Sequence, residues 1–164
     1  MNPPRSDALV FFGASGDLAY KQIFPALQAL MRRGRLDEPI IAVARSGWTL
    51  DQLRARARES IEKHGSIDED AFAKLSRQLL YIDGDYNSPE TFGKIHDALN
   101  GAQRPAHYLA IPPSVFPVVI ESLARADCAE NARVILEKPF HVAELLDLVG
   151  LFCGLGIPAE AHTT

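Results

Sequence analysis

The 164-residue sequence has few cysteines, no excess of basic residues and no long apolar run. Its two cysteines, Cys128 and Cys153, do not have the spacing of metal ligands, and they are typical of thiols in a reducing compartment. The formal net charge of -4 argues against a nucleic-acid-binding protein, because such proteins are usually basic. No apolar run approaches the roughly 20 residues that cross a membrane, and the N-terminus lacks the apolar core of a secretory signal. We therefore expect a cytoplasmic location and no metal, nucleic acid or membrane partner.

Two kinds of apolar segment alternate along the chain. Short runs typical of buried strands cover residues 7–12, 39–44, 79–82, 106–111 and 132–137. Helical spacing of apolar residues is found at 18–33, 50–61, 70–78, 89–99 and 115–126, and again from Val142. Candidate helix caps are Thr49 with Gln52, Ser66 with Glu69, and Ser88 before Pro89. This alternation predicts an α/β fold: a doubly wound, Rossmann-like parallel sheet with helices on both faces, formed by residues 1–164 as a single domain.

The stretch VFFGASGDLAYKQ places two glycines between the first predicted strand and the first predicted helix. Gly13 can make a tight turn, Gly16 has no side chain to block a phosphate, and Ala19 lets the helix lie close to the strand. The first turn of a helix offers unpaired N–H groups to an anion. The spacing Gly-x-x-Gly-x-x-Ala alone also fits a turn without ligand. With a strand before it and a helix after it, the turn predicts a dinucleotide site.

The end of the second predicted strand indicates which dinucleotide is bound. NAD sites commonly carry an acidic residue here, which accepts hydrogen bonds from the ribose hydroxyls. This chain has Arg45 and Ser46 instead, and a guanidinium with a hydroxyl can receive the 2′-phosphate of NADP. A solvent-exposed arginine without a ligand is the alternative. The position of Arg45 favours NADP.

Five short segments resemble the N-terminal coenzyme domain of the glucose-6-phosphate dehydrogenase family. They are GASGDLA (13–19), ARS (44–46), GDY (84–86), YLAIPP (108–113) and EKPF (137–140), and they occur in the family's order. The resemblance covers most of the chain and implies an NADP-dependent oxidoreductase that oxidises glucose 6-phosphate. The GASGDLA turn also resembles short-chain dehydrogenases, but no tyrosine here has a lysine four residues later.

The resemblance implies a role for each matching residue. The pyrophosphate would be lined by Gly13, Ala14, Ser15, Gly16, Asp17, Leu18, Ala19 and Tyr20. The 2′-phosphate would bind Arg45 and Ser46, and Asp85, Tyr86 and Tyr108 would lie along the adenosine and nicotinamide halves. Lys138 would face both the nicotinamide and the substrate, and the bond before Pro139 would be cis. A homo-oligomer is possible.

The chain also departs from the family's pattern. Gln22 stands where the family has a basic residue near the substrate, and His141 replaces a glycine. The family's RIDHYLGK segment and its catalytic histidine have no counterpart here, so no catalytic residue is assigned. We expect this chain alone to bind coenzyme and to turn over glucose 6-phosphate very slowly or not at all. Two functions therefore remain open: the coenzyme domain of a dehydrogenase, or a regulatory NADP-binding module without turnover.

Overall fold

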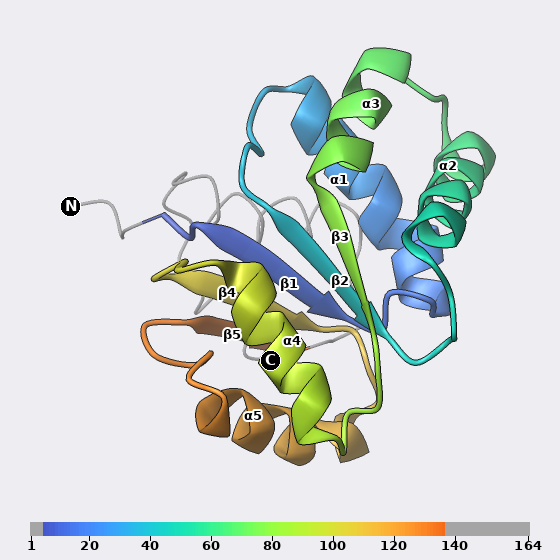
Figure 1. Ribbon diagram of the computed structural model, residues 1–164. Helices are drawn as coiled ribbons and strands as arrows, with labels where there is room; N and C mark the ends of the chain where they lie inside the picture. Colours follow the sequence, from blue (N-terminus) through green and yellow to red (C-terminus); the bar gives the residue numbers. More distant parts are fainter. Residues whose placement is uncertain (1–4, 137–164) are drawn as a thin grey trace, which may run out of the picture.

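A five-stranded parallel sheet forms the centre of the molecule (Figure 1). The computed structural model describes residues 5–136. The strands are β1 (Ala8–Phe12), β2 (Ile40–Ala44), β3 (Leu79–Asp83), β4 (Pro105–Leu109) and β5 (Arg133–Leu136). Their order in the sheet is β3-β2-β1-β4-β5, and every pairing is parallel. Strands β1, β2 and β4 are buried along their whole length, as expected for strands covered on both faces.

Helices cover both faces of the sheet. On one face lie a π-helical turn, η1 (Ala19–Ile23), and helices α1 (Phe24–Arg32), α2 (Leu50–His64) and α3 (Glu69–Gln78). On the other face lie α4 (Pro89–Leu99) and α5 (Phe116–Arg125), which follows a 3-10 turn, η2 (Pro113–Val115). No helix within residues 5–136 is long and apolar enough to cross a membrane. The predicted doubly wound fold is confirmed.

Alternation along β1 divides the core into two layers. Leu9 and Phe11 pack with α1, α2 and α3, whereas Val10 and Phe12 pack with α4 and α5. Successive side chains of a strand point to opposite faces, so a one-residue shift of β1 would exchange the two sets. The register is held by β2 and β4 on either side, where Phe12 is opposite Val43 and Leu109.

The observed helix caps agree only partly with those predicted from the sequence. Thr49 and Gln52 form the predicted capping box at α2. The prediction for Ser66 and Glu69 is wrong: α3 begins after Asp68, whose side chain accepts from the Ala71 N–H at 3.1 Å. Ser88 is the N-cap residue of α4 and Pro89 lies in its first turn, as predicted, although the Ser88 side chain makes no capping hydrogen bond.

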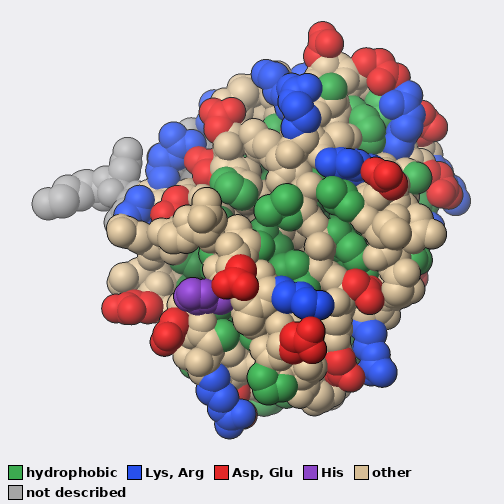
Figure 2. Space-filling view, viewed as in Figure 1, with side chains coloured by type: hydrophobic (Ala, Val, Ile, Leu, Met, Phe, Trp, Pro, Cys, Tyr) green, Lys and Arg blue, Asp and Glu red, His purple; other side chains and the backbone are tan. Residues whose placement is uncertain are grey.

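The visible surface carries both signs of charge. In Figure 2, Lys and Arg side chains are interspersed with Asp and Glu side chains and do not gather in one patch. The mixture agrees with the small net charge of -4.

Candidate functional site

The candidate site lies at the carboxyl ends of the central strands. The chain runs from β1 to its neighbour β2 on one side, and later from β3 across to β4 on the other side of β1. The strand order therefore reverses between β1 and β4, where open α/β sheets bind their ligands. The glycine turn leaves β1 at this point, and the segment Ala110–Ile111 leaves β4 beside it.

Gly13 is required by the fold at this reversal. Its φ of +86° is in the left-handed region, and a Cβ atom added there would lie 2.1 Å from the Ala110 carbonyl oxygen. Its N–H group donates to the Val43 carbonyl oxygen at 2.9 Å and also to the Tyr86 hydroxyl at 2.9 Å. The turn is thus held by β2, by the segment after β4 and by the loop after β3.

The turn after Gly13 contains both bonded and unbonded backbone N–H groups. Gly16 and Asp17 are exposed, and the Gly16 N–H donates to the Gly13 carbonyl oxygen at 3.0 Å. Within residues 5–136, the Asp17 and Leu18 N–H groups donate to no backbone or side-chain acceptor. They stand at the start of the helical segment formed by η1 and α1, where the aligned peptide dipoles favour an anion.

Buried alanines hold this helical start against the sheet. Ala14 and Ala19 are almost fully buried, and both belong to the core layer under α1. Ser15 is half-buried in the turn itself, and Leu18 packs against the edge of that layer. The small side chain of Ala19 is consistent with the close approach predicted from the sequence.

Tyr20 contacts α2. Its hydroxyl donates to Glu59 Oε1 at 2.9 Å, and the Arg56 guanidinium lies 3.9 Å from the ring centroid. Its carbonyl oxygen accepts a hydrogen bond from the Ser60 hydroxyl. Desolvation and the Glu59 carboxylate raise the pKa of Tyr20. These contacts fasten the helical segment to α2.

Arg45 and Ser46 follow β2 at the same edge of the sheet. The Arg45 side chain is 72% exposed, and its Nη1 lies 3.2 Å from Asp85 Oδ2. The Ser46 N–H donates to Asp83 Oδ1 at 2.9 Å. An exposed ion pair of this kind contributes little to stability, so an anionic ligand can replace one partner.

Asp85 and Tyr86 reach the site from the loop after β3. Asn87 donates to Asp85 Oδ1 from its backbone N–H at 2.8 Å and from Nδ2 at 3.1 Å. These bonds, with a smaller contribution from Arg45, lower the pKa of Asp85. Tyr86 packs edge-on against Phe12 and binds the glycine turn through its hydroxyl.

Tyr108 is buried beneath this edge, and the structure does not describe Lys138. Tyr108 is the fourth of the five residues of β4, next to the carboxyl end of the strand and opposite Phe11, and it is only 4% exposed in the core layer under α1. Lys138 lies outside the described residues, as do Pro139 and His141. The glycine turn, Arg45 with Ser46, and Asp85 with Tyr86 are therefore the predicted groups that the structure brings to one edge. Asp83 also lies there, and the sequence reasoning missed it because it belongs to no motif.

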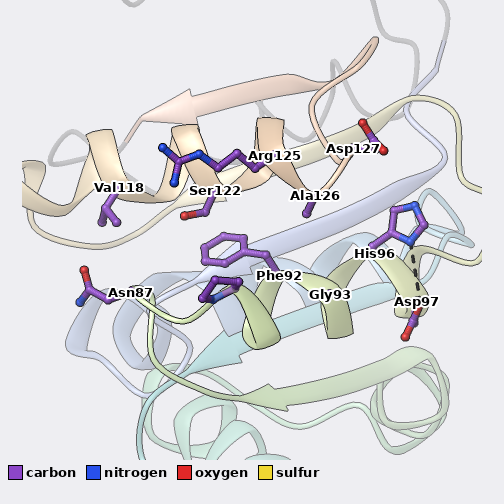
Figure 3. Close-up of a pocket in the computed structure, with 11 residues that line it drawn as sticks. Asn87, Phe92, Gly93, His96, Asp97, Val118, Ser122, Arg125, Ala126 and Asp127 are labelled. Carbon is purple, nitrogen blue, oxygen red and sulfur yellow. Dashed lines mark ion pairs between the residues drawn. The ribbon is translucent and has the colours of Figure 1, made fainter.

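A pocket lies between α4 and α5 (Figure 3), and one of its lining residues is Asn87, which donates to Asp85 in the loop after β3. Figure 3 shows Phe92 and Val118 facing across it, with His96 and Asp97 toward one end. Its volume is about 520 Å³. Within residues 5–136, no group of three or more His, Cys, Asp or Glu side chains could hold a metal ion.

A parallel sheet of this order, with a glycine turn opening into a helix start at its switch point, defines a nucleotide-binding domain of the Rossmann class. The family model described as glucose-6-phosphate dehydrogenase, NAD binding domain, matches residues 10–144. The chain belongs to this family.

Individual relatives agree with this membership. The chain is 42% identical over 145 residues to glucose-6-phosphate 1-dehydrogenase 1 of Mycobacterium bovis, covering 87% of this chain and 31% of that protein. A crystal structure of the Mycobacterium avium enzyme superposes with a TM-score of 0.78 at 42% identity, over 87% of this chain and 33% of the other. A glucose-6-phosphate dehydrogenase in complex with its substrate gives 0.73 at 30% identity, over 90% and 34%. The chain thus spans about a third of the length of these relatives.

Proposed function

We propose that this chain is the coenzyme-binding part of an NADP-dependent oxidoreductase that acts on glucose 6-phosphate. The observation that carries the proposal is the meeting of the glycine turn, the unbonded Asp17 and Leu18 N–H groups and Arg45 at one edge of the sheet. Family membership supports the dehydrogenase chemistry, and the substrate is the one named for the solved relative in complex with glucose 6-phosphate.

The residues at this edge fit a dinucleotide with a 2′-phosphate. We propose that the turn from Gly13 to Ala19 holds the pyrophosphate, because Asp17 and Leu18 offer N–H groups and Gly16 has no side chain in the way. Arg45 would receive the 2′-phosphate, since its guanidinium has five N–H donors and only Nη1 contacts Asp85. The bound coenzyme would accept hydride from the substrate.

Some roles stay predictions. Ser46 would add its side chain to the 2′-phosphate site, and Asp85 with Tyr86 would border the adenosine half beside the turn. Tyr108 would act from beneath the site, because its side chain is part of the core. The contact of Lys138 with nicotinamide and sugar phosphate, the homo-oligomer and the cytoplasmic location also stay predictions.

Coenzyme titrations test the proposal. The dissociation constants of NADP and NAD are measured for the unmodified chain, for Arg45→Ala and for Arg125→Ala. Arg125 is the matched control, because it is an exposed arginine of α5 paired with Glu121. The unmodified chain should prefer NADP by about 10- to 150-fold, which is the contribution of a charge-assisted pair. Arg45→Ala should lose most of this preference while keeping NAD affinity, and Arg125→Ala should keep it.

Equal affinities for NADP and NAD in the unmodified chain would contradict the choice of coenzyme. NADP reduction with glucose 6-phosphate, followed in parallel, should be very slow or undetectable for this chain alone, and a rate ordinary for a dehydrogenase would contradict that expectation. Glucose serves as the control substrate, because it lacks the phosphate group.

A further inference from the structure

Asp83 collects three hydrogen bonds on one oxygen atom. It is the last residue of β3, and its Oδ1 accepts from the Ser46 N–H at 2.9 Å, the Gly47 N–H at 2.8 Å and the Tyr81 hydroxyl at 2.6 Å. The Tyr81 bond first, and then the two backbone bonds, lower the pKa of Asp83. The carboxylate is therefore ionised at neutral pH.

These bonds fix the backbone on both sides of Arg45. Before it, Ala44 pairs with Asp83 in the sheet and accepts from the Gly84 N–H at 2.9 Å. After it, Ser46 and Gly47 are held by the Asp83 carboxylate. Gly47 has a φ of +68°, in the left-handed region that favours glycine, so the chain turns directly after these two bonded N–H groups. Arg45 thus has a constrained main chain and an exposed side chain.

A second carboxylate from the same loop contacts the side chain of Arg45. Asp85 Oδ2 lies 3.2 Å from Arg45 Nη1, while its Oδ1 is occupied by Asn87. The two acids therefore make different contacts. Asp83 binds the backbone of the loop, and Asp85 binds the Arg45 guanidinium. A phosphate can replace Asp85 at the guanidinium, but it cannot replace the bonds that Asp83 makes to the backbone.

We propose that Asp83 is a positioning residue that sets the preference for a 2′-phosphorylated dinucleotide by fixing the loop that presents Arg45 and Ser46. The inference rests on the proposed function, and it assigns Asp83 no contact with the coenzyme. A bidentate contact between guanidinium and phosphate depends on geometry, because its two hydrogen bonds must form together. Movement of the Arg45 backbone would therefore weaken NADP binding more than NAD binding.

The rival explanation treats Asp83 only as a negative charge. A carboxylate near a bound phosphate repels it, so removing the charge would strengthen NADP binding. The positioning role makes a different prediction: the place of the Oδ1 acceptor matters, and the charge matters little. Two substitutions separate these effects. Asp83→Asn keeps the acceptor in place and removes the charge, whereas Asp83→Glu keeps the charge and moves the acceptor by one methylene.

The experiment measures the dissociation constants of NADP and NAD for both variants, with thermal unfolding as the check of folding. Asp83→Asn should keep the NADP preference within about 3-fold, because an amide oxygen accepts the same bonds at roughly half the strength. Asp83→Glu should reduce the preference by about 10-fold, the lower end of what the charge-assisted contact contributes. NAD affinity should change little in either variant.

Two further variants show whether Asp83 acts through Arg45. Tyr81→Phe removes one donor to Asp83 Oδ1 but leaves the Ser46 and Gly47 bonds, so it should lower stability and keep the preference. Arg45→Ala combined with Asp83→Glu should lose no more preference than Arg45→Ala alone, since coupled residues are not additive.

Each of three outcomes would overturn the inference. An unchanged preference in Asp83→Glu would show that the position of the acceptor is unimportant. Stronger NADP binding by Asp83→Asn would support simple repulsion. Further loss in the double variant would give Asp83 a contact of its own. A chain without any NADP preference would instead overturn the proposed function and this inference together.

Discussion

Replacing Gly13 by alanine tests whether the glycine turn is set by the fold. A side chain at φ +86° is strained by about 1–2 kcal/mol. The new Cβ would also lie 2.1 Å from the Ala110 carbonyl oxygen, so the turn or the segment after β4 must move. Such overlap costs about 1–3 kcal/mol more. We therefore expect Gly13→Ala to lower the free energy of unfolding by about 2–5 kcal/mol, a large share of a typical domain's stability.

Gly34 provides a matched control. It has a φ of +66° after α1, yet a Cβ atom there would meet nothing within 4 Å. Gly34→Ala should therefore show the backbone strain alone, about 1–2 kcal/mol. Both substitutions restrict the unfolded chain equally, so this effect cancels in the comparison. Urea unfolding followed by circular dichroism measures the difference. Equal destabilisation by the two variants would refute the contact with Ala110 as the reason for glycine at position 13.

Three further predictions concern other contacts. Tyr86→Phe removes an acceptor of the Gly13 N–H and should lower stability by about 1 kcal/mol in urea unfolding; no change would contradict this role. Thr49→Ala should cost about 1 kcal/mol through its capping box, whereas Ser88→Ala, which removes no capping bond, should cost less than about 0.5; equal losses would contradict the assignment. Burial lowers the pKa of His107. Below about pH 6.5 the unfolded chain therefore binds a proton at His107 more readily than the folded chain does, and the free energy of unfolding should fall as the pH drops. His107→Phe should flatten this pH dependence, and an unaltered slope would assign it to other groups.

The strands were predictable because their signal is local. Each is a short apolar run, and burial on both faces makes the central three almost wholly apolar. The capping box at Thr49 was predictable for a similar reason, because both of its bonds lie within four residues. The doubly wound class was predicted, but the order of the strands within the sheet was not, because it depends on contacts along the whole chain.

The wrong cap prediction at Ser66 has a tertiary cause. Gln28, from α1, donates to the Ser66 carbonyl oxygen at 3.1 Å and accepts from the Asp68 N–H at 3.1 Å. It thereby fixes the entry to α3 two residues later than the sequence pattern suggested. Before α4, the Thr91 hydroxyl donates to the Asp85 carbonyl oxygen at 2.8 Å, and Ser88 supplies no side-chain bond. These partners cannot be read from neighbouring residues.

The sequence motifs identified individual candidate site residues, but they did not predict the hydrogen bonds that connect these residues. Gly13 and Arg45 were identified because each stands at a known position after a strand. The bonds from Ser46 and Gly47 to Asp83 join segments 37 and 36 residues apart, and no local pattern announces them. The contact of Tyr20 with α2 was also missed: its hydroxyl donates to Glu59, and its place beside the pyrophosphate stays a prediction.

The contact between Gly13 and Ala110 bears on how inactive descendants of this domain would be recognised. Alanine at position 13 collides with the backbone after β4 whether or not a coenzyme is present. A lineage that abandoned dinucleotide binding would still need this glycine to fold. At Gly16 a Cβ atom would meet only the Gly13 carbonyl oxygen, at 3.3 Å, so the fold constrains that position much less. Loss of the second glycine, with the first retained, is therefore the expected mark of a decayed coenzyme site.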